Sequence, residues 1–178
     1  LHRRRHSFPT RRSSDLGNRV STAKLSPLTE TAGTLSQVLL PEEDVPSNYW
    51  VDEQELNQWE FLKGPKSLER TTRDGFSYNY SEGKMAYPDA LDRPSRTILT
   101  GEGGKTPSRF KHIINTGKGF RRLTPVELER LNGFPDSWTK FGHTGNEIPD
   151  SRRAFFMGNA LVVGVVERLG KQILKDFF

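Results

Sequence analysis

The sequence contains no cysteine among its 178 residues. This absence excludes a disulfide framework, a thiolate metal site and a cysteine nucleophile within the chain. Hydrophobic residues make up only 33% of the sequence, and no apolar run approaches the ~20 residues that a membrane-spanning helix needs. We therefore expect no membrane segment and no metal site, and a length that suits one or two small domains with a modest core.

Most of the chain also has no excess of positive charge, although the formal net charge is +5. Residues 1–24 carry a net charge of +6, so the remaining residues carry −1. Residues 1–16 lack an initiating methionine and an apolar core typical of a signal peptide, and they resemble translated sequencing-adapter read-through. We interpret them as an artefactual leader; a basic DNA-binding arm or a targeting peptide are the alternatives.

Residues 121–136 are the most strongly specified local structure. Thr124 and Glu127 have the spacing of a capping box, in which each side chain bonds the other residue's backbone amide. Pro125 occupies the first helical position, where its missing N–H is tolerated. Gly133 can adopt the left-handed conformation that closes a helix, and Pro135 prevents continuation. The pattern predicts a helix of about two turns.

Positive charge is concentrated in residues 93–122, which have a local net charge of +7 with Glu102 as the single acid. Two runs of β character, residues 96–100 and 110–114, flank a glycine-rich loop at residues 101–108. Backbone amides, hydroxyls and basic side chains in such a loop suit phosphate oxygens. The loop therefore indicates DNA contact, with a solvated hairpin of ordinary surface charge as the alternative.

The segment before this region divides into an acidic part and an aromatic part. Residues 29–40 are predicted to form a short helix or turn, and the acidic residues 51–62 a helix with Leu56, Trp59 and Leu62 on a buried face. Residues 76–80 alternate, so their aromatic side chains share one strand face. Such a face is usually core packing, and base recognition is the alternative.

The C-terminal segment is predicted to be a loop followed by a helix. Residues 138–150 have loop character, and Asn159 is a good N-cap for a largely apolar helix over residues 160–174. Gly164 within this helix indicates close packing against another element. If this helix has nothing to cover, its exposed apolar face would promote aggregation.

Three ordered stretches resemble motifs of the DNA cytosine-5 methyltransferases. The end of that family's target-recognition region is matched by residues 96–100 with Gly103 and Gly104, and its last motif by residues 156–163. Its arginine-leucine-threonine and phenylalanine-proline motif is matched by Arg122, Leu123, Thr124, Glu127, Arg130, Gly133, Phe134 and Pro135. The resemblance covers roughly residues 93–170, and three matches in order are far more specific than one.

The resemblance implies a mixed α/β architecture and a set of residue roles. Residues 17–115 would form the target-recognition region, and residues 116–178 the helices that return to a Rossmann-like methyltransferase domain. The expected DNA-binding residues are Arg96, Thr97, Gly103, Gly104, Lys105, Arg109 and Arg122, with Thr97 on a phosphate beside the extruded cytosine. Thr124, Glu127 and Arg130 would be structural, and Asn159 and Ala160 would lie beside the methyl donor. Glu102 lies where family members vary, which leaves base recognition by Glu102 open.

The chemistry implied by the resemblance needs groups that this chain lacks. In the family, the cytosine leaves the duplex, a cysteine adds to C6, and C5 takes the methyl group of S-adenosylmethionine. This chain has no cysteine and no glycine-rich strand-to-helix turn of the type that binds the donor. We therefore expect no catalytic residue here and no activity from the chain alone.

Three interpretations follow from the resemblance. The chain is a C-terminal fragment of a DNA cytosine-5 methyltransferase of a restriction-modification system, which we favour, or a DNA-binding subunit of a split methyltransferase, or a non-enzymatic DNA-recognition module. The expected partners are double-stranded DNA and the missing catalytic half or a separate catalytic subunit. The expected location is the prokaryotic cytoplasm, at the nucleoid through DNA.

Overall fold

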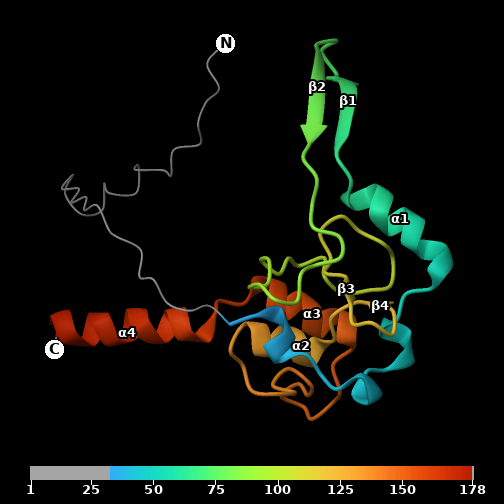
Figure 1. Ribbon diagram of the computed structural model, residues 1–178. Coiled ribbons are helices and arrows are strands. Elements are labelled where there is room, and N and C mark those ends of the chain that lie inside the picture. Colours follow the sequence, from blue (N-terminus) through green and yellow to red (C-terminus); the bar gives the residue numbers. More distant parts are fainter. Residues whose placement is uncertain (1–32, 178) are drawn as a thin grey trace, which may run out of the picture. The chain divides into compact units, whose positions relative to one another are not determined.

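The computed structural model describes residues 33–177, which belong to one compact unit of the chain. The predicted leader at residues 1–16 and the start of the segment 29–40 lie outside the described residues. Figure 1 shows the order of the elements. They are η2 (Leu35–Val38), η3 (Glu42–Asp44), η4 (Ser47–Tyr49), α1 (Glu53–Lys63), β1 (Lys66–Thr71), β2 (Ser77–Glu82), β3 (Ile114–Asn115), β4 (Phe120–Arg121), α2 (Pro125–Leu131), α3 (Asp150–Asn159) and α4 (Val163–Phe177).

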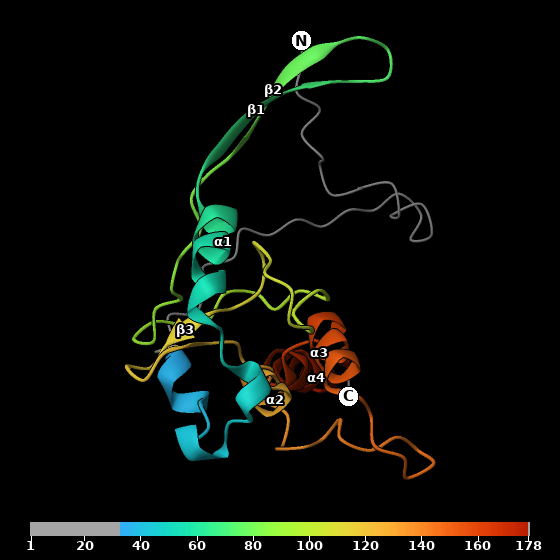
Figure 2. The ribbon, with the colours of Figure 1, turned by 90° about the vertical axis from the view of Figure 1, so that its right-hand side faces the viewer.

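Helix α1 confirms the helix predicted for the acidic segment, with bounds shifted slightly towards the C-terminus. Asp52 is its N-cap, and Trp59 is completely buried. Leu56 and Leu62 are half-buried on the same side of the helix. Figure 2 shows that α1 leads directly into the hairpin of β1 and β2.

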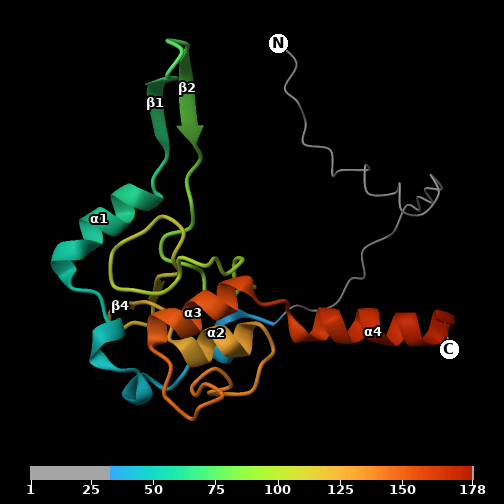
Figure 3. The same ribbon diagram turned by 180° about the vertical axis from the view of Figure 1, so that it is seen from behind.

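Strands β1 and β2 form an antiparallel hairpin whose register runs from Lys66 opposite Glu82 to Thr71 opposite Ser77. Gly75 closes the turn with a positive φ of 80°. The predicted alternation is present, but its interpretation as core packing is wrong, because Phe76 is 62% exposed and Tyr78 is 40% exposed. No buried surface is available to these rings, since the hairpin extends away from α2 and α3 (Figures 1 and 3).

Helix α2 confirms the most strongly specified prediction. The Thr124 amide donates to Glu127 Oε2 at 2.7 Å, and the Glu127 amide donates to Thr124 Oγ1 at 3.3 Å. Gly133 has a φ of +79°, and its amide donates to the carbonyl of Arg130 at 2.9 Å. Local capping chemistry therefore determines both ends of this helix.

The core of the described residues joins α2 and α3 to extended segments. Its buried members are Leu35, Ile98, Ile114, Leu123, Leu128, Ala154 and Met157. Helix α3 comes so close to residues 99–100 that a Cβ on Gly158 would lie 2.4 Å from the carbonyl carbon of Leu99. A glycine is therefore required at this contact.

The two strands predicted around the glycine-rich loop are largely wrong. Residues 96–100 form no strand, and of residues 110–114 only Ile114 belongs to one, the short pair of β3 and β4. Buried carboxylates replace a neighbouring strand as hydrogen-bond acceptors: the Ile113 amide donates to Asp89 at 2.9 Å and the His112 amide to Glu102 at 2.6 Å.

The prediction of Asn159 as an N-cap is also wrong. Residues up to Asn159 are already helical in α3, and Ala160 is extended, with a ψ of 151°. Asn159 instead donates its side-chain amide to the Phe155 carbonyl at 3.0 Å. The next helix, α4, starts at Val163, whose amide donates to the Asn132 carbonyl at 2.8 Å.

Helix α4 exposes an apolar stripe formed by Val163, Val166, Leu169 and Ile173, each between 38% and 60% exposed. This confirms the predicted exposed face. The close packing predicted for Gly164 is absent, since no described atom lies within 4 Å of a Cβ placed there. No helix of the described residues is long and apolar enough to cross a membrane.

Candidate nucleic-acid interface

A buried ion pair joins β4 to α2 next to the candidate interface. Glu127 accepts two hydrogen bonds from the Arg121 guanidinium, at 2.7 and 3.0 Å, and both side chains are fully buried. The same carboxylate accepts from the amides of Thr124 and Leu40, at 2.7 and 2.9 Å. A bidentate, fully bonded carboxylate of this kind holds three chain segments in one geometry.

Two further side chains of α2, Glu129 and Arg130, make polar contacts that hold this helix in place. Glu129 is fully buried and accepts from Arg153 at 3.0 Å and from the Thr139 amide at 2.9 Å. Arg130 pairs with Asp136 at 2.6 Å and donates to the Val38 carbonyl at 3.1 Å. The three residues expected to be structural, Thr124, Glu127 and Arg130, therefore all make internal contacts in the structure.

The loop at residues 101–108 is held from inside by two cations. Arg122 donates to the Gly104 carbonyl at 2.8 Å and lies over the Tyr49 ring at 4.9 Å. Lys111 donates to the carbonyls of Gly104 and Thr106, at 3.1 and 2.8 Å. Burial, together with the nearby Arg122 charge, holds the pKa of Lys111 below its ordinary value. Both cations thus bind the backbone of the loop.

The glycines of this loop have separate roles. A Cβ on Gly103 would lie 2.9 Å from the Cα of Ser151, so Gly103 lets the loop lie against the start of α3. Gly104 has a φ of +86°, in the region that favours glycine. Lys105 follows directly and its side chain is exposed, as is that of Thr97. These two exposed polar side chains are available to an anionic ligand.

Arg96 is directed inward. Its guanidinium donates to Asp89 at 2.5 and 3.1 Å, and the Lys63 ammonium lies 3.5 Å from the same carboxylate. Burial alone would raise the pKa of Asp89, but these cations and the Ile113 amide hold that pKa below its ordinary value. Arg96 therefore acts as a structural cation in this chain.

Arg109 is also directed inward, towards the base of the hairpin. Its guanidinium donates to the carbonyls of Leu62 and Gly64, at 3.1 and 3.0 Å, and to the carbonyl of Gly83. It also lies 3.3 Å from the carboxylate of Glu82. Arg109 thus binds the chain where it enters β1 and where it leaves β2.

Base recognition by Glu102 is contradicted by its position. Glu102 is 5% exposed and accepts from the His112 amide. The His112 ring is fully buried, and its Nε2 lies 3.0 Å from the Ser95 hydroxyl. Glu102 therefore organises the backbone beneath the loop, and its carboxylate is withheld from any external ligand.

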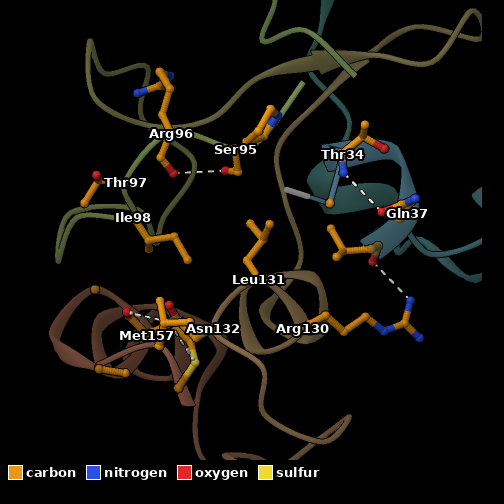
Figure 4. A pocket seen from close by; sticks show the side chains of 16 residues that line it. Thr34, Gln37, Ser95, Arg96, Thr97, Ile98, Arg130, Leu131, Asn132 and Met157 are labelled. Atoms are coloured by element: carbon orange, nitrogen blue, oxygen red, sulfur yellow. Dashed lines mark hydrogen bonds between the residues drawn. The ribbon is translucent and has the colours of Figure 1, made fainter. Parts of the chain in front are cut away.

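A pocket of about 690 Å³ lies between η2, the segment 94–98 and the ends of α2 and α3 (Figure 4). Ala160 and Thr97 line it, and Asn132 donates to the Met157 carbonyl in its wall at 2.9 Å. Asn159 is exposed and is not among its lining residues. Of the two residues expected beside the methyl donor, only Ala160 faces this pocket. The described residues include no group of three or more acidic or histidine side chains placed to hold a metal ion.

Sequence reasoning missed several residues that shape this site, including Tyr49, Asp89 and Arg121. Asp89 and Tyr49 have no periodic pattern or motif that marks them. Arg121 precedes Arg122, and the two look equivalent in the sequence. The capping-box carboxylate of Glu127 was the one available signal for a buried arginine partner.

Known proteins resemble this chain both in structure and in sequence. The structure of the S. pombe Dnmt2 methyltransferase aligns with a TM-score of 0.52 at 20% identity, covering 81% of this chain and 42% of that protein. The mixed α/β fold of this chain is thus similar to that of part of this methyltransferase structure.

The family follows from the sequence comparison. A model of the C-5 cytosine-specific DNA methylases matches residues 12–175. The type II methyltransferase M.Sau3AI of Staphylococcus aureus is 40% identical over 156 residues, covering 88% of this chain and 35% of that protein. M.HpaII of Haemophilus parainfluenzae is 28% identical over 150 residues, with coverages of 75% and 36%. The chain belongs to the C-5 cytosine-specific DNA methylase family.

This membership confirms the family expected from the three motifs. The chain spans about a third of the length of these curated relatives. The division at residues 16 and 115 and the roles of the individual site residues stay predictions.

Proposed function

We propose that this chain is the DNA-recognising, C-terminal part of a DNA cytosine-5 methyltransferase that modifies double-stranded DNA in a restriction-modification system. The family supports the chemistry, and the type II methyltransferases among its relatives support the setting. The single observation that carries DNA recognition is the loop at residues 101–108. Arg122 and Lys111 bind its backbone carbonyls, and the side chain of Lys105 within the loop remains exposed.

In this proposal, the predicted DNA-binding residues fall into three groups. Thr97 and Lys105 contact phosphates, because both side chains are exposed and a phosphate accepts from hydroxyl and ammonium groups. Gly103 and Gly104 allow the loop backbone its close approach. Arg96, Arg109 and Arg122 act indirectly, since their guanidinium groups are bound to Asp89 or to backbone carbonyls.

The methyl donor would be S-adenosylmethionine, which supplies the methyl group when bound. Ala160 fits the edge of such a site, because it lines the 690 Å³ pocket together with apolar Ile98 and Met157. Asn159, exposed at the end of α3, would face the donor from outside this pocket. The donor's main binding surface would come from the rest of the enzyme.

Methyl transfer would also need a nucleophile from outside this chain, which contains no cysteine. The rest of the enzyme would be either a continuation of the same polypeptide or a separate catalytic subunit. The stripe of Val163, Val166, Leu169 and Ile173 on α4 fits either origin, because an exposed apolar stripe marks a contact surface. The predicted cytoplasmic, nucleoid-associated location is part of this proposal.

The test is transfer of tritium from labelled S-adenosylmethionine to duplex DNA. We expect no transfer by the purified chain, and transfer when the portion of M.Sau3AI outside the matched region is added. That portion alone is the control and is expected to be inactive. Transfer by the chain alone would contradict the missing nucleophile.

DNA binding is measured separately, by fluorescence anisotropy of a labelled duplex. We expect the chain to bind and its affinity to fall steeply between about 50 and 200 mM salt, as phosphate contacts require. No binding at the lower salt concentration would overturn the proposed DNA-recognition role.

A further inference from the structure

Within residues 33–177, no other element covers either face of the hairpin of β1 and β2. All its strand residues are exposed except Lys66, Tyr80 and Glu82, which are half-buried. Leu68 is 49% exposed and Phe76 is 62% exposed. A two-stranded hairpin is at best marginally stable alone in water. Both faces of the hairpin are therefore available to a ligand.

The base of the hairpin is nevertheless fixed. Arg109 donates to the carbonyls of Leu62 and Gly64, which precede β1, and to the carbonyl of Gly83, which follows β2. Next to it, the Met85 amide donates to the Lys63 carbonyl at 2.9 Å, and the buried Lys63 ammonium donates to the Lys111 carbonyl at 2.7 Å. The hairpin is thus presented in a set direction, beyond α1 (Figures 1 and 2).

The charge of the hairpin favours a polyanion. Glu82 is neutralised by Arg109 at 3.3 Å. The exposed or half-buried charges that remain within the hairpin are three basic and two acidic, namely Lys66, Arg70, Arg73, Glu69 and Asp74, and the exposed Lys84 lies two residues beyond it. Arg70 lies over the Tyr80 ring at 4.0 Å, which holds its guanidinium in place.

The side chains of the hairpin also match base edges. Arg73 is exposed in the turn, and an arginine fork pairs with the two acceptors of guanine. Asn79 lies on the opposite strand within a polar face, where its Oδ1 accepts from Ser67 at 3.0 Å. Its amide nitrogen has no partner among the described residues, and asparagine pairs with adenine.

We propose that this hairpin, residues 66–82, is a two-stranded ribbon that enters the major groove of the target DNA, where Arg73 and Asn79 read base edges. The major groove is about 12 Å wide and admits a β-ribbon. The inference rests on the proposed function and adds to it the element and the side chains that determine specificity. Arg109 is then a positioning residue for this ribbon.

The first test is selection of bound duplexes from a library with randomised base pairs, using the full chain. We expect Arg73→Ala and Asn79→Ala each to weaken the preference at one base-pair position by roughly tenfold, while binding to unselected duplex changes much less. Lys175→Ala and Asn146→Ala are matched controls outside the hairpin and should keep the full preference. Unchanged preferences in both hairpin variants would overturn the inference.

The second test needs no substitution. 5-Iododeoxyuridine places its iodine in the major groove, and irradiation links it to nearby aromatic side chains. We expect the link at Phe76 or Tyr78, found by mass spectrometry of the digested complex. Links confined to other parts of the chain would contradict a ribbon in the major groove.

The outcomes separate this inference from the proposed function. If the unaltered chain binds no duplex, the proposed function fails and the inference fails with it. If the chain binds duplex but the hairpin variants retain its preference, only the inference fails. If Tyr78→Ser abolishes a concentration-dependent dimer and leaves DNA preference unchanged, the hairpin contacts a second copy of the chain and the inference is wrong.

Discussion

At the scale of single residues, the arginines near the candidate interface differ chiefly in what their guanidinium groups bind. Arg121 forms a fully buried pair with Glu127, and Arg96 pairs with the buried Asp89. Arg109 and Arg122 bind backbone carbonyls. Removal of one partner of such a contact should lower the free energy of unfolding, because the other partner is left buried with an unpaired charge or without a hydrogen bond.

The first prediction concerns the pair of Arg121 and Glu127. Glu127→Ala should lower the free energy of unfolding by about 3–5 kcal/mol, because it leaves a buried arginine unpaired. Thr124→Ala, which removes one capping hydrogen bond of the same helix, should cost only about 1 kcal/mol. Urea unfolding followed by circular dichroism measures both. Equal effects of the two substitutions would show that the ion pair adds nothing to the cap.

The second prediction concerns acid stability and Asp89, whose folded-state pKa lies below its ordinary value. A lowered pKa contributes stability that is present above the ordinary value and is lost as the pH falls through the folded-state value. Between about pH 5 and pH 2, Asp89→Asn should therefore lose less stability than the unaltered chain. Near neutral pH the variant should be the less stable, since Arg96 and Lys63 lose their anionic partner.

Urea midpoints over this pH range measure the difference. Asp74→Asn is the matched control, because Asp74 is exposed in the hairpin turn. Parallel pH profiles for Asp89→Asn and the unaltered chain would contradict the assignment.

At the scale of elements, the hairpin and α4 are the parts whose surfaces are least covered by the rest of the described chain. The hairpin is attached through Arg109, and α4 through the contact of Val163 with Asn132. Each element forms from local sequence, but its orientation depends on these few contacts. Substitutions at these contacts should therefore increase local opening of the hairpin or of α4 more than they lower the free energy of global unfolding.

The third prediction concerns Arg109. Arg109→Lys keeps the positive charge but loses the fork that binds three carbonyls at once. We expect faster hydrogen exchange for amides of residues 66–82, with little change in α2 and α3. Arg70→Lys, a substitution within the hairpin but outside this contact, is the control. Unaltered exchange in the hairpin would mean that Arg109 does not hold it.

The fourth prediction concerns the apolar stripe of α4. Val166→Glu combined with Leu169→Glu should reduce self-association of the chain, because both side chains are about half exposed. The melting temperature should stay nearly constant, since neither residue belongs to the buried core. Sedimentation velocity and a thermal melt measure the two effects. If self-association persists in the double variant, a surface other than the α4 stripe is responsible for it.

At the scale of the whole molecule, the excess of positive charge lies at the start of the chain. Residues 1–24 carry a net charge of +6, whereas the other residues together carry −1. Non-specific attraction to DNA depends on the number of phosphates neutralised. Sequence preference depends on contacts with base edges. The two properties should therefore separate when the start of the chain is removed.

The fifth prediction is that residues 17–178 bind unselected duplex more weakly and with a shallower salt dependence than the full chain. Their preference for a selected sequence should be unchanged, because the loop at residues 101–108 and the hairpin are retained. Anisotropy titrations at several salt concentrations measure both. Loss of preference on truncation would assign base reading to the predicted leader.

The sequence by itself determined the features that depend on neighbours along the chain. The capping box, Pro125 and Gly133 specify α2 within a few residues, and the structure has the helix where these signals predict it. The alternation of residues 76–80 likewise predicts a strand, and β2 spans Ser77–Glu82. The order of three motifs was enough to indicate the family that the comparisons show.

Only the tertiary structure decided which polar groups are buried and what they bind. Adjacent Arg121 and Arg122 have the same side chain, yet one is enclosed against Glu127 and the other binds Gly104. Residues 96–100 have β character but form no strand, and in the second such run, residues 110–114, the amides of His112 and Ile113 donate to Glu102 and Asp89. Apart from Arg121 with Glu127, these pairings join residues 10 to 24 positions apart, so the local patterns of the sequence do not indicate them.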